Sequence, residues 1–312
     1  MEGADLKPLQ HQTLPVLAGI VLSFIFGLSF LFSKEALATL EPLELLAHRF
    51  SLAVAILFLL RTFRLTNFNY RPGMLRDLLP LALFQPVVYF LGETYGVKLT
   101  TASESGLVIS LVPLAVTFLG NLWLHENATW RQWIFIWISL IGVGSIIVSH
   151  SGVNIGQHSV GIIYLLVAVS AAAIYNVMSR KLSGKYNPLE ITSVMMGTGA
   201  IFFNSIYYLS LPEKAAYFSA FTNYKTILSL VYLGGLSSVV AFFLVNYMLK
   251  QLPASRAAAF TNLTTIVSVL AGILFRGERF GLIQLFGGVM ILIGVWGSNL
   301  FQPRITDRQA KG

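Results

Sequence analysis

The stretch LPVLAGIVLSFIFGLSFLF, residues 14–32, decides the fold of this chain, and it contains no charged side chain. A helix that crosses a membrane needs about 20 mostly apolar residues, because the hydrocarbon core is roughly 30 Å thick. The stretch therefore predicts a transmembrane helix. The residues before it are polar and lack a strongly basic leader, and no persuasive cleavage site follows. We therefore interpret it as the first helix and not as a signal peptide.

The rest of the chain has the same character. Of its 312 residues, 55% are hydrophobic and 11% are charged, and the mean hydropathy is +0.73. Soluble domains carry about 25% charged residues, so this chain has too few charges to cover a globule in water. High hydrophobicity with low charge also excludes intrinsic disorder. The absence of cysteine excludes disulfides, thiolate metal sites and thiol nucleophiles.

Ten apolar segments are long enough to span a membrane. They lie near residues 14–33, 43–60, 78–97, 103–124, 133–149, 160–178, 191–211, 227–249, 255–275 and 282–301. A β-barrel would need strands of about 10 residues with alternating polarity, whereas these runs are continuously apolar. The connections between them are short, so no soluble domain is left over. The sequence predicts an all-α integral membrane protein with ten transmembrane helices.

Ten spans place both ends of the chain on the same side of the membrane. The segments on that side hold fourteen Lys and Arg residues, whereas the opposite loops and their edges hold six. Because short cytoplasmic loops collect basic residues, the bias predicts a multi-pass protein of the cell membrane with both termini in the cytoplasm. The bias also explains the formal net charge of +8, so we do not expect nucleic acid as a partner.

The two halves of the chain repeat one another. A shift of 146 residues aligns PLE at 42–44 with PLE at 188–190, and a shift of 152 aligns LIGV at 140–143 with LIGV at 292–295. Each half holds five spans, and an odd number turns the second copy upside down. Such inverted repeats recur in secondary transporters, where the substrate site lies near the membrane midplane between the halves. We expect the two inverted five-helix repeats at 14–149 and 159–301.

The repeated residues resemble a known family. In the first half they are Thr101-Ala102-Ser103, Pro113, Glu126 and Gly142-Val143, and in the second half they lie at 253–257, 277–279 and 292–295. The pattern is similar to the EamA-type repeat of the drug/metabolite transporter superfamily. This resemblance implies ten helices, cytoplasmic termini, a central cavity between the halves and transport of small metabolites, often by export. The matched pair Glu126 and Glu278 predicts a structural role in loops.

One departure from the family pattern concerns the ninth span. The second repeat has Thr264 and Thr265 where family members often carry a proline. We therefore expect the ninth span to lack the kink that Pro113 produces in the fourth.

Ionisable groups inside the spans are the first candidates for a transport site. A charged side chain at the centre of a membrane costs at least about 2.5–3.5 kcal/mol, so each one needs a reason. Arg49, His48, Glu93 and Glu104 lie at similar depth in the half of the bundle opposite the termini. Glu93 or Glu104 is a candidate for binding a cationic amine or a coupling proton. Alternatively, Arg49 pairs with one of these glutamates and locks the helices, and Glu104 is also favoured by the dipole at a helix N-terminus.

Polar residues deep in the spans are the second group of candidates. They include Gln85 and Tyr89 in the third span and the adjacent pair Tyr175 and Asn176 in the sixth. We prefer Tyr175 and Asn176 as the pair that faces the ligand. The alternative is hydrogen bonding between helices, which is worth about 0.6 kcal/mol on average. No cofactor or metal is expected, because no histidine or cysteine completes a site near Met195 and Met196.

Together these features predict a secondary transporter. We expect it to move a small organic metabolite, amino-acid-like or drug-like, by alternating access, with export driven by protons or a counter-solute. No phosphate-binding GxxxxGK[ST] motif is present, so the chain contains no ATP-driven motor of that kind. Two alternatives are a membrane-embedded enzyme acting on a lipid-linked substrate and an uncoupled facilitator or channel. The sequence leaves open whether the protein is a monomer or a homodimer.

Overall fold

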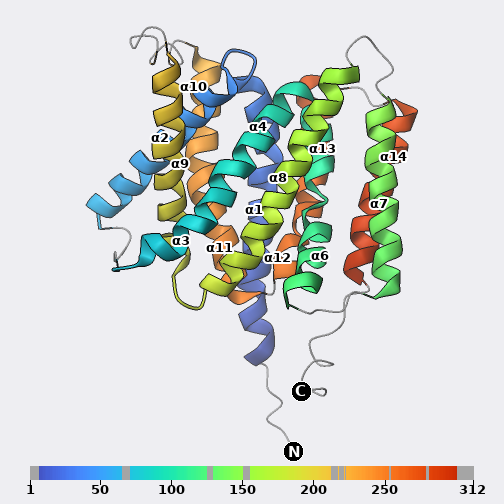
Figure 1. The fold of residues 1–312 in the computed structure, drawn as a ribbon, viewed down its shortest axis with the longest axis horizontal. Coiled ribbons are helices and arrows are strands. Elements are labelled where there is room, and N and C mark those ends of the chain that lie inside the picture. Colours follow the sequence, from blue (N-terminus) through green and yellow to red (C-terminus); the bar gives the residue numbers. More distant parts are fainter. Residues whose placement is uncertain are drawn as a thin grey trace, which may run out of the picture.

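The computed structural model describes residues 7–64, 71–124, 129–149, 155–211, 217, 221, 223–252, 254–278 and 281–300. All elements in these ranges are helices (Figure 1). In the first half they are α1 (Lys7–Ala36), α2 (Pro42–Thr62), α3 (Met74–Ala82), η1 (Leu83–Val88), α4 (Tyr89–Leu99), α5 (Ala102–Ile109), α6 (Val112–Leu124) and α7 (Trp130–Ser149). In the second half they are α8 (Ile155–Leu182), α9 (Pro188–Ser210), α10 (Tyr224–Val231), η3 (Tyr232–Val240), α11 (Ala241–Gln251), α12 (Ala254–Ala258), α13 (Thr261–Arg276) and α14 (Leu282–Leu300).

The described residues cross the bundle ten times, as predicted. Four crossings consist of several elements in series, namely α3–η1–α4, α5–α6, α10–η3–α11 and α12–α13. Eight helical stretches in the described part of the chain have the length and hydropathy of membrane spans, and the apolar stretch Leu282–Ser298 of α14 is slightly shorter. The predicted all-helical membrane fold is therefore confirmed.

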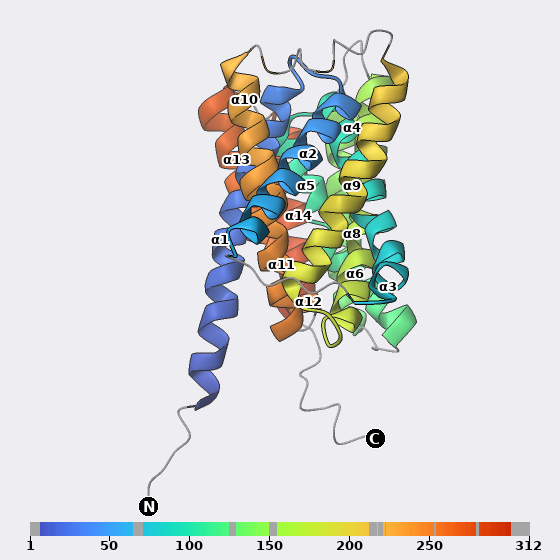
Figure 2. The same ribbon diagram turned by 90° about the vertical axis from the view of Figure 1, so that its left-hand side faces the viewer.

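The two halves run in opposite directions. In Figure 1, α1 begins at the lower face of the bundle, whereas α8, which begins the second half, starts at the upper face. We call the face where α1 begins and α14 ends the terminal face, and the opposite face the distal face. Figure 2 shows the helices standing side by side, with α1 extending beyond the others at the terminal face.

The repeated PLE motif begins equivalent helices in the two halves. α2 and α9 both start at the proline, which fits the first turn because its missing N–H would have no partner there. In α9 the Asn187 side chain accepts from the Glu190 amide, and the Glu190 carboxylate accepts from the Asn187 amide, each at 2.8 Å. Such reciprocal capping satisfies two of the free N–H groups at a helix start.

The ninth span is broken, so the expected absence of a kink was wrong. α12 ends at Ala258 and α13 begins at Thr261, although no proline lies there. A hydroxyl group supplies a partner at the break, because the Thr261 hydroxyl donates to the carbonyl of Ala258. The Phe260 carbonyl accepts from the Thr264 amide at 3.2 Å and also from the Ser23 hydroxyl of α1 at 2.9 Å. Side-chain hydroxyls can replace backbone partners inside a membrane, so a helix can break without proline.

Candidate functional site

A cavity of about 80 Å³ lies between the two halves of the bundle. Helices of the first half contribute polar side chains from Arg49, Gln85, Tyr89 and Glu93, and α8 of the second half contributes Tyr175 and Asn176. Its other walls are mostly apolar and aromatic, including Phe26, Phe30, Phe90, Phe242 and Met248. The volume is enough for several water molecules. An apolar pocket with a few convergent polar groups has the character of a small-molecule site.

Arg49 is the largest charged group at this cavity, and only 2% of its surface is exposed. Its Nε donates to the Ser238 hydroxyl at 2.8 Å, and its Nη2 donates to the Ser237 hydroxyl at 2.9 Å. The guanidinium carbon lies 4.3 Å from the centre of the Phe90 ring. Both serines belong to η3, so an arginine of the first half is held by the second half. A planar guanidinium suits such fixed, multiple contacts.

Glu93 lies beside Arg49 without a direct hydrogen bond to it. The Arg49 Nη1 and Glu93 Oε2 atoms are 4.0 Å apart, which is too long for a hydrogen bond. Glu93 is 3% exposed, and within the described part of the chain its Oε2 has no hydrogen-bond partner. A buried carboxylate oxygen without a donor is energetically costly. The cavity therefore presents a fixed cation and a carboxylate oxygen that lacks a donor.

Tyr175 and Asn176 line the cavity, but the Tyr175 hydroxyl is already bonded. It donates to the Asn246 side-chain oxygen at 2.6 Å, and Ser179 donates to the same oxygen at 2.8 Å. The Asn246 amide nitrogen in turn donates to the Thr192 hydroxyl at 3.0 Å. Tyr175 thus forms a wall of the cavity with its ring, while its hydroxyl joins α8 to α11.

The third span is broken beside the cavity. Gln85 has φ −142° and ψ 109°, which is extended backbone inside an otherwise helical crossing. The cause is local, because Pro86 disfavours helical geometry in the residue before it and cannot donate a backbone hydrogen bond. Gln85 and Tyr89 both line the cavity near this break. Discontinuous helices at the site are a recurring feature of secondary transporters.

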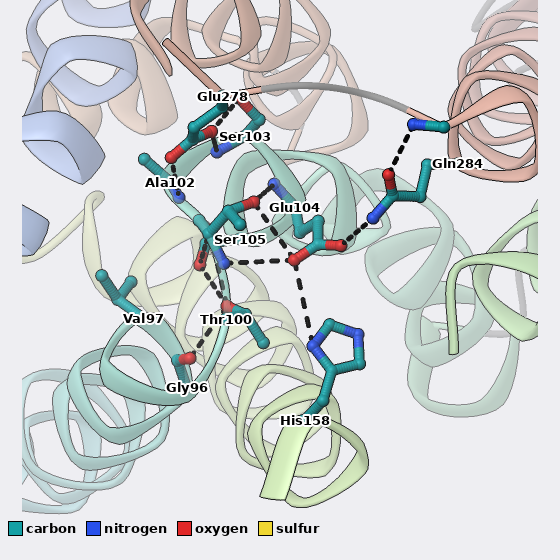
Figure 3. Close-up of polar contacts among 12 residues, drawn as sticks. Gly96, Val97, Thr100, Ala102, Ser103, Glu104, Ser105, His158, Glu278 and Gln284 are labelled. Atoms are coloured by element: carbon teal, nitrogen blue, oxygen red, sulfur yellow. Dashed lines mark hydrogen bonds and ion pairs between the residues drawn. The ribbon is translucent and has the colours of Figure 1, made fainter. Parts of the chain in front are cut away.

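His48 and Glu104 do not line this cavity. The His48 ring is buried among aromatic rings, with centroids 4.7 Å from Tyr217 and 5.1 Å from Phe221. Glu104 lies at the start of α5, where its carboxylate accepts from the Thr101 amide at 3.1 Å and from the Gln284 side chain at 2.9 Å (Figure 3). The structure therefore places Glu93, and not Glu104, beside Arg49.

Sequence reasoning missed the serines that hold Arg49. Ser237 and Ser238 are both fully buried and follow two glycines in the run GGLSS, residues 234–238. A methyl group at Gly234 would lie 2.9 Å from the carbonyl oxygen of Arg49, so glycine allows η3 to approach α2 closely. Small and hydroxyl residues together in the middle of an apolar span are the signal that could have indicated this contact.

Comparison with known proteins agrees with this architecture. The model of the EamA-like transporter family matches residues 13–148 and again residues 159–300. The uncharacterized transporter YcxC of Bacillus subtilis (strain 168) is 35% identical over 305 residues, covering 96% of this chain and 97% of YcxC. An uncharacterized transporter of Archaeoglobus fulgidus is 29% identical over 274 residues, with 87% and 93% coverage. A solved crystal structure shares the fold, with a TM-score of 0.65, 16% identity, and coverage of 93% of this chain and 99% of its own.

Proposed function

Because this chain belongs to the EamA-like transporter family, we propose that it is a secondary transporter whose small organic solute passes through the cavity beside Arg49 and Glu93. When two related halves run in opposite directions, each half can adopt the conformation of the other. The protein then has one state open to each side of the membrane. The cavity lies between these halves and takes residues from both. Rocking of one half against the other around the cavity would therefore expose the solute to each side in turn.

The charges of the cavity favour an amino-acid-like solute. The Glu93 Oε2 atom is buried without a hydrogen-bond donor, 4.0 Å from the Arg49 guanidinium, and the proposal rests on this atom. A solute ammonium would supply that donor, and a solute carboxylate would bond the guanidinium N–H groups. A zwitterion does both without adding net charge to a site of low dielectric constant.

The direction and driving force follow from the same proposal. We expect both termini to be cytoplasmic, because the terminal face collects the Lys and Arg residues. Export of an amino-acid-like solute would then be driven by protons or by a counter-solute. Glu93 is the group at the cavity that could accept a proton when the solute ammonium leaves.

Binding of three related molecules by the full chain in liposomes tests the proposal. The molecules are leucine, its decarboxylated amine and its deaminated acid. We expect leucine to bind at least about tenfold more tightly than either analogue, because each analogue leaves one buried charge without its partner. Glu93→Gln should remove the preference for leucine over the deaminated acid, and Arg49→Gln the preference for leucine over the amine.

Glu41→Gln is the matched control, because the Glu41 side chain is 75% exposed and pairs with Lys98 at the distal face. This variant should bind all three molecules as the original chain does. Equal binding of leucine and its amine would contradict the zwitterion proposal and leave Arg49 with a structural role. Transport that cannot accumulate solute against a gradient, whatever the imposed pH difference, would favour an uncoupled facilitator.

A further inference from the structure

We propose that α5 is a gate between the distal face and the cavity, and that Glu278 holds this gate closed. The inference rests on the alternating access proposed above. It concerns a contact between the halves that lies away from Arg49 and Glu93, at the start of α5 (Figure 3).

α5 connects the distal face with the cavity. It starts after the Thr101 cap, runs for eight residues and ends where the crossing breaks at Ser110 and Leu111. At this end Ile109 lines the cavity, and Val112 lines it just beyond the break. The break before Pro113 supplies a hinge, because proline cannot continue the hydrogen-bond pattern of the preceding turn. A tilt of α5 about this hinge would open the cavity toward the distal face.

The Glu278 carboxylate of the second half caps α5 of the first half. Its Oε1 accepts from the Ala102 amide and its Oε2 from the Ser103 amide, each at 3.0 Å, and Oε2 also accepts from the Ser103 hydroxyl. The first amides of a helix have no partner inside the helix, and the helix dipole favours negative charge there. Glu278 therefore supplies what the start of α5 needs from outside its own half.

Further contacts fasten the same short helix to the second half. The Ser268 hydroxyl of α13 donates to the Ala102 carbonyl at 2.9 Å, and the Thr265 hydroxyl donates to the Gly106 carbonyl at 3.0 Å. A methyl group at Gly106 would lie 2.5 Å from the Ser268 hydroxyl, so the two helices are as close as glycine permits. Each of these contacts joins the two halves and must break if the halves separate at the distal face.

The number of donors makes the Glu278 contact the strongest candidate to hold the gate, because its carboxylate accepts from two backbone amides and one hydroxyl. Ser103, to which it bonds, is fully buried, while Glu278 itself is partly exposed. The ion pair between Arg276 and Glu35 also joins the halves at this face, but its side chains are 28% and 37% exposed. Exposed ion pairs contribute little because water screens them, whereas hydrogen bonds from buried amides to a carboxylate are strong.

The absence of cysteine from this chain allows a direct test. An Asn176→Cys variant carries one thiol at the cavity wall, and a membrane-impermeant methanethiosulfonate reagent reports its accessibility in liposomes of defined orientation. We expect this thiol to react faster from the terminal face than from the distal face. Adding Glu278→Gln, which keeps the size of the side chain, should speed labelling from the distal face by about tenfold, the scale of losing one charged hydrogen bond.

Glu35→Gln is the matched control, and it should leave both labelling rates unchanged because it removes only exposed ion pairs at the same face, those with Arg276 and Lys225. A second variant pair tests the gate independently of the labelling rates, because it holds α5 and residue 278 together instead of loosening them. Ser103→Cys with Glu278→Cys, joined by a short bifunctional thiol reagent, should stop solute exchange until a reductant restores it.

The outcomes separate the gate from the transport pathway. Unchanged distal labelling in Glu278→Gln, with normal labelling from the terminal face, would overturn the gate and leave the proposed pathway intact. Exchange that continues at its full rate after complete crosslinking of α5 to Glu278→Cys would also overturn the gate. Failure of Asn176→Cys to react from either face, in every variant, would overturn the proposed pathway and the gate together.

Discussion

The guanidinium of Arg49 lies 4.0 Å from the carboxylate of Glu93, and it donates its hydrogen bonds to Ser237 and Ser238 instead. Two opposite charges thus share one cavity without being bonded to each other. The arginine is fixed by neutral groups of the other half, while one glutamate oxygen has no donor. This arrangement leaves both charges available to a solute, whereas a closed ion pair would have neutralised them internally.

The contributions of Arg49 and Glu93 to the free energy of unfolding should depend on each other. Arg49→Gln leaves a buried carboxylate unpaired, and Glu93→Gln leaves a buried guanidinium unpaired, so each should cost about 3–5 kcal/mol. The double variant should be more stable than either single one, because it buries no lone charge. Denaturation in detergent, followed as a double-mutant cycle, measures this coupling. Costs that simply add would mean that the two groups do not interact.

Ser237 and Ser238 of η3 should determine how tightly the cavity binds leucine, because they hold Arg49 in place. Ser237→Ala together with Ser238→Ala removes both acceptors and frees the guanidinium to rotate. We expect leucine binding to weaken by about tenfold to a hundredfold, on the scale of lost hydrogen bonds to a charged group. Ser229→Ala is the control, because the buried Ser229 hydroxyl donates to its own helix at the Lys225 carbonyl. Equal losses in the control and in the double variant would point to general destabilisation.

Tyr175 should tolerate loss of its hydroxyl better than Asn246 tolerates loss of its amide. Tyr175→Phe removes one hydrogen bond and keeps the cavity wall, so we expect a cost of about 1 kcal/mol and retained transport. Asn246→Leu leaves the Tyr175 and Ser179 hydroxyls without their acceptor and removes the bond to Thr192, so its cost should be two to three times larger. Thermal unfolding and solute exchange of the two variants give both quantities. Abolished exchange in Tyr175→Phe would instead assign its hydroxyl to the solute.

The pairing of α7 with α14 should depend on Gly142. A methyl group there would lie 2.6 Å from the carbonyl oxygen of Gly287, whereas one at Gly144 meets nothing within 4 Å. Gly142→Ala should therefore destabilise the protein by about 1–3 kcal/mol through overpacking. Gly144→Ala should be neutral or stabilise by up to about 1 kcal/mol, because alanine favours the helix. Unfolding of the two variants under the same conditions compares them directly.

The orientation of the bundle can be read from two single thiols. Lys185 is 63% exposed at the terminal face, and Glu41 is 75% exposed at the distal face. If the terminal face is cytoplasmic, an impermeant reagent should label Glu41→Cys in intact cells and Lys185→Cys only after the membrane is permeabilised. The reverse pattern would invert the topology and the proposed direction of transport.

The sequence by itself determined the features that depend on neighbouring residues. Long apolar runs predict the crossings, because backbone groups in a membrane must be satisfied within the same helix. The repeated PLE motifs align the two halves, and their position at equivalent helix starts has a local cause, because proline lacks an N–H that would need a partner and the glutamate two residues later accepts from the amide of the capping residue. The cost of placing charge in a membrane singles out four candidates from the sequence alone, namely Arg49, His48, Glu93 and Glu104.

Only the tertiary structure decided which of these residues meet. Ser238 lies 189 residues from Arg49, and Glu278 lies 176 residues from Ala102, so no local pattern links them. His48 and Glu104 have the same chemical signal as Glu93, but packing places them among aromatic rings and at a helix cap. Hydropathy and helix capping depend on residues that are close in sequence. Which residues line the cavity depends instead on how the ten crossings pack together. That packing joined Arg49, Glu93 and Tyr175 at one cavity and α5 to Glu278 at one face.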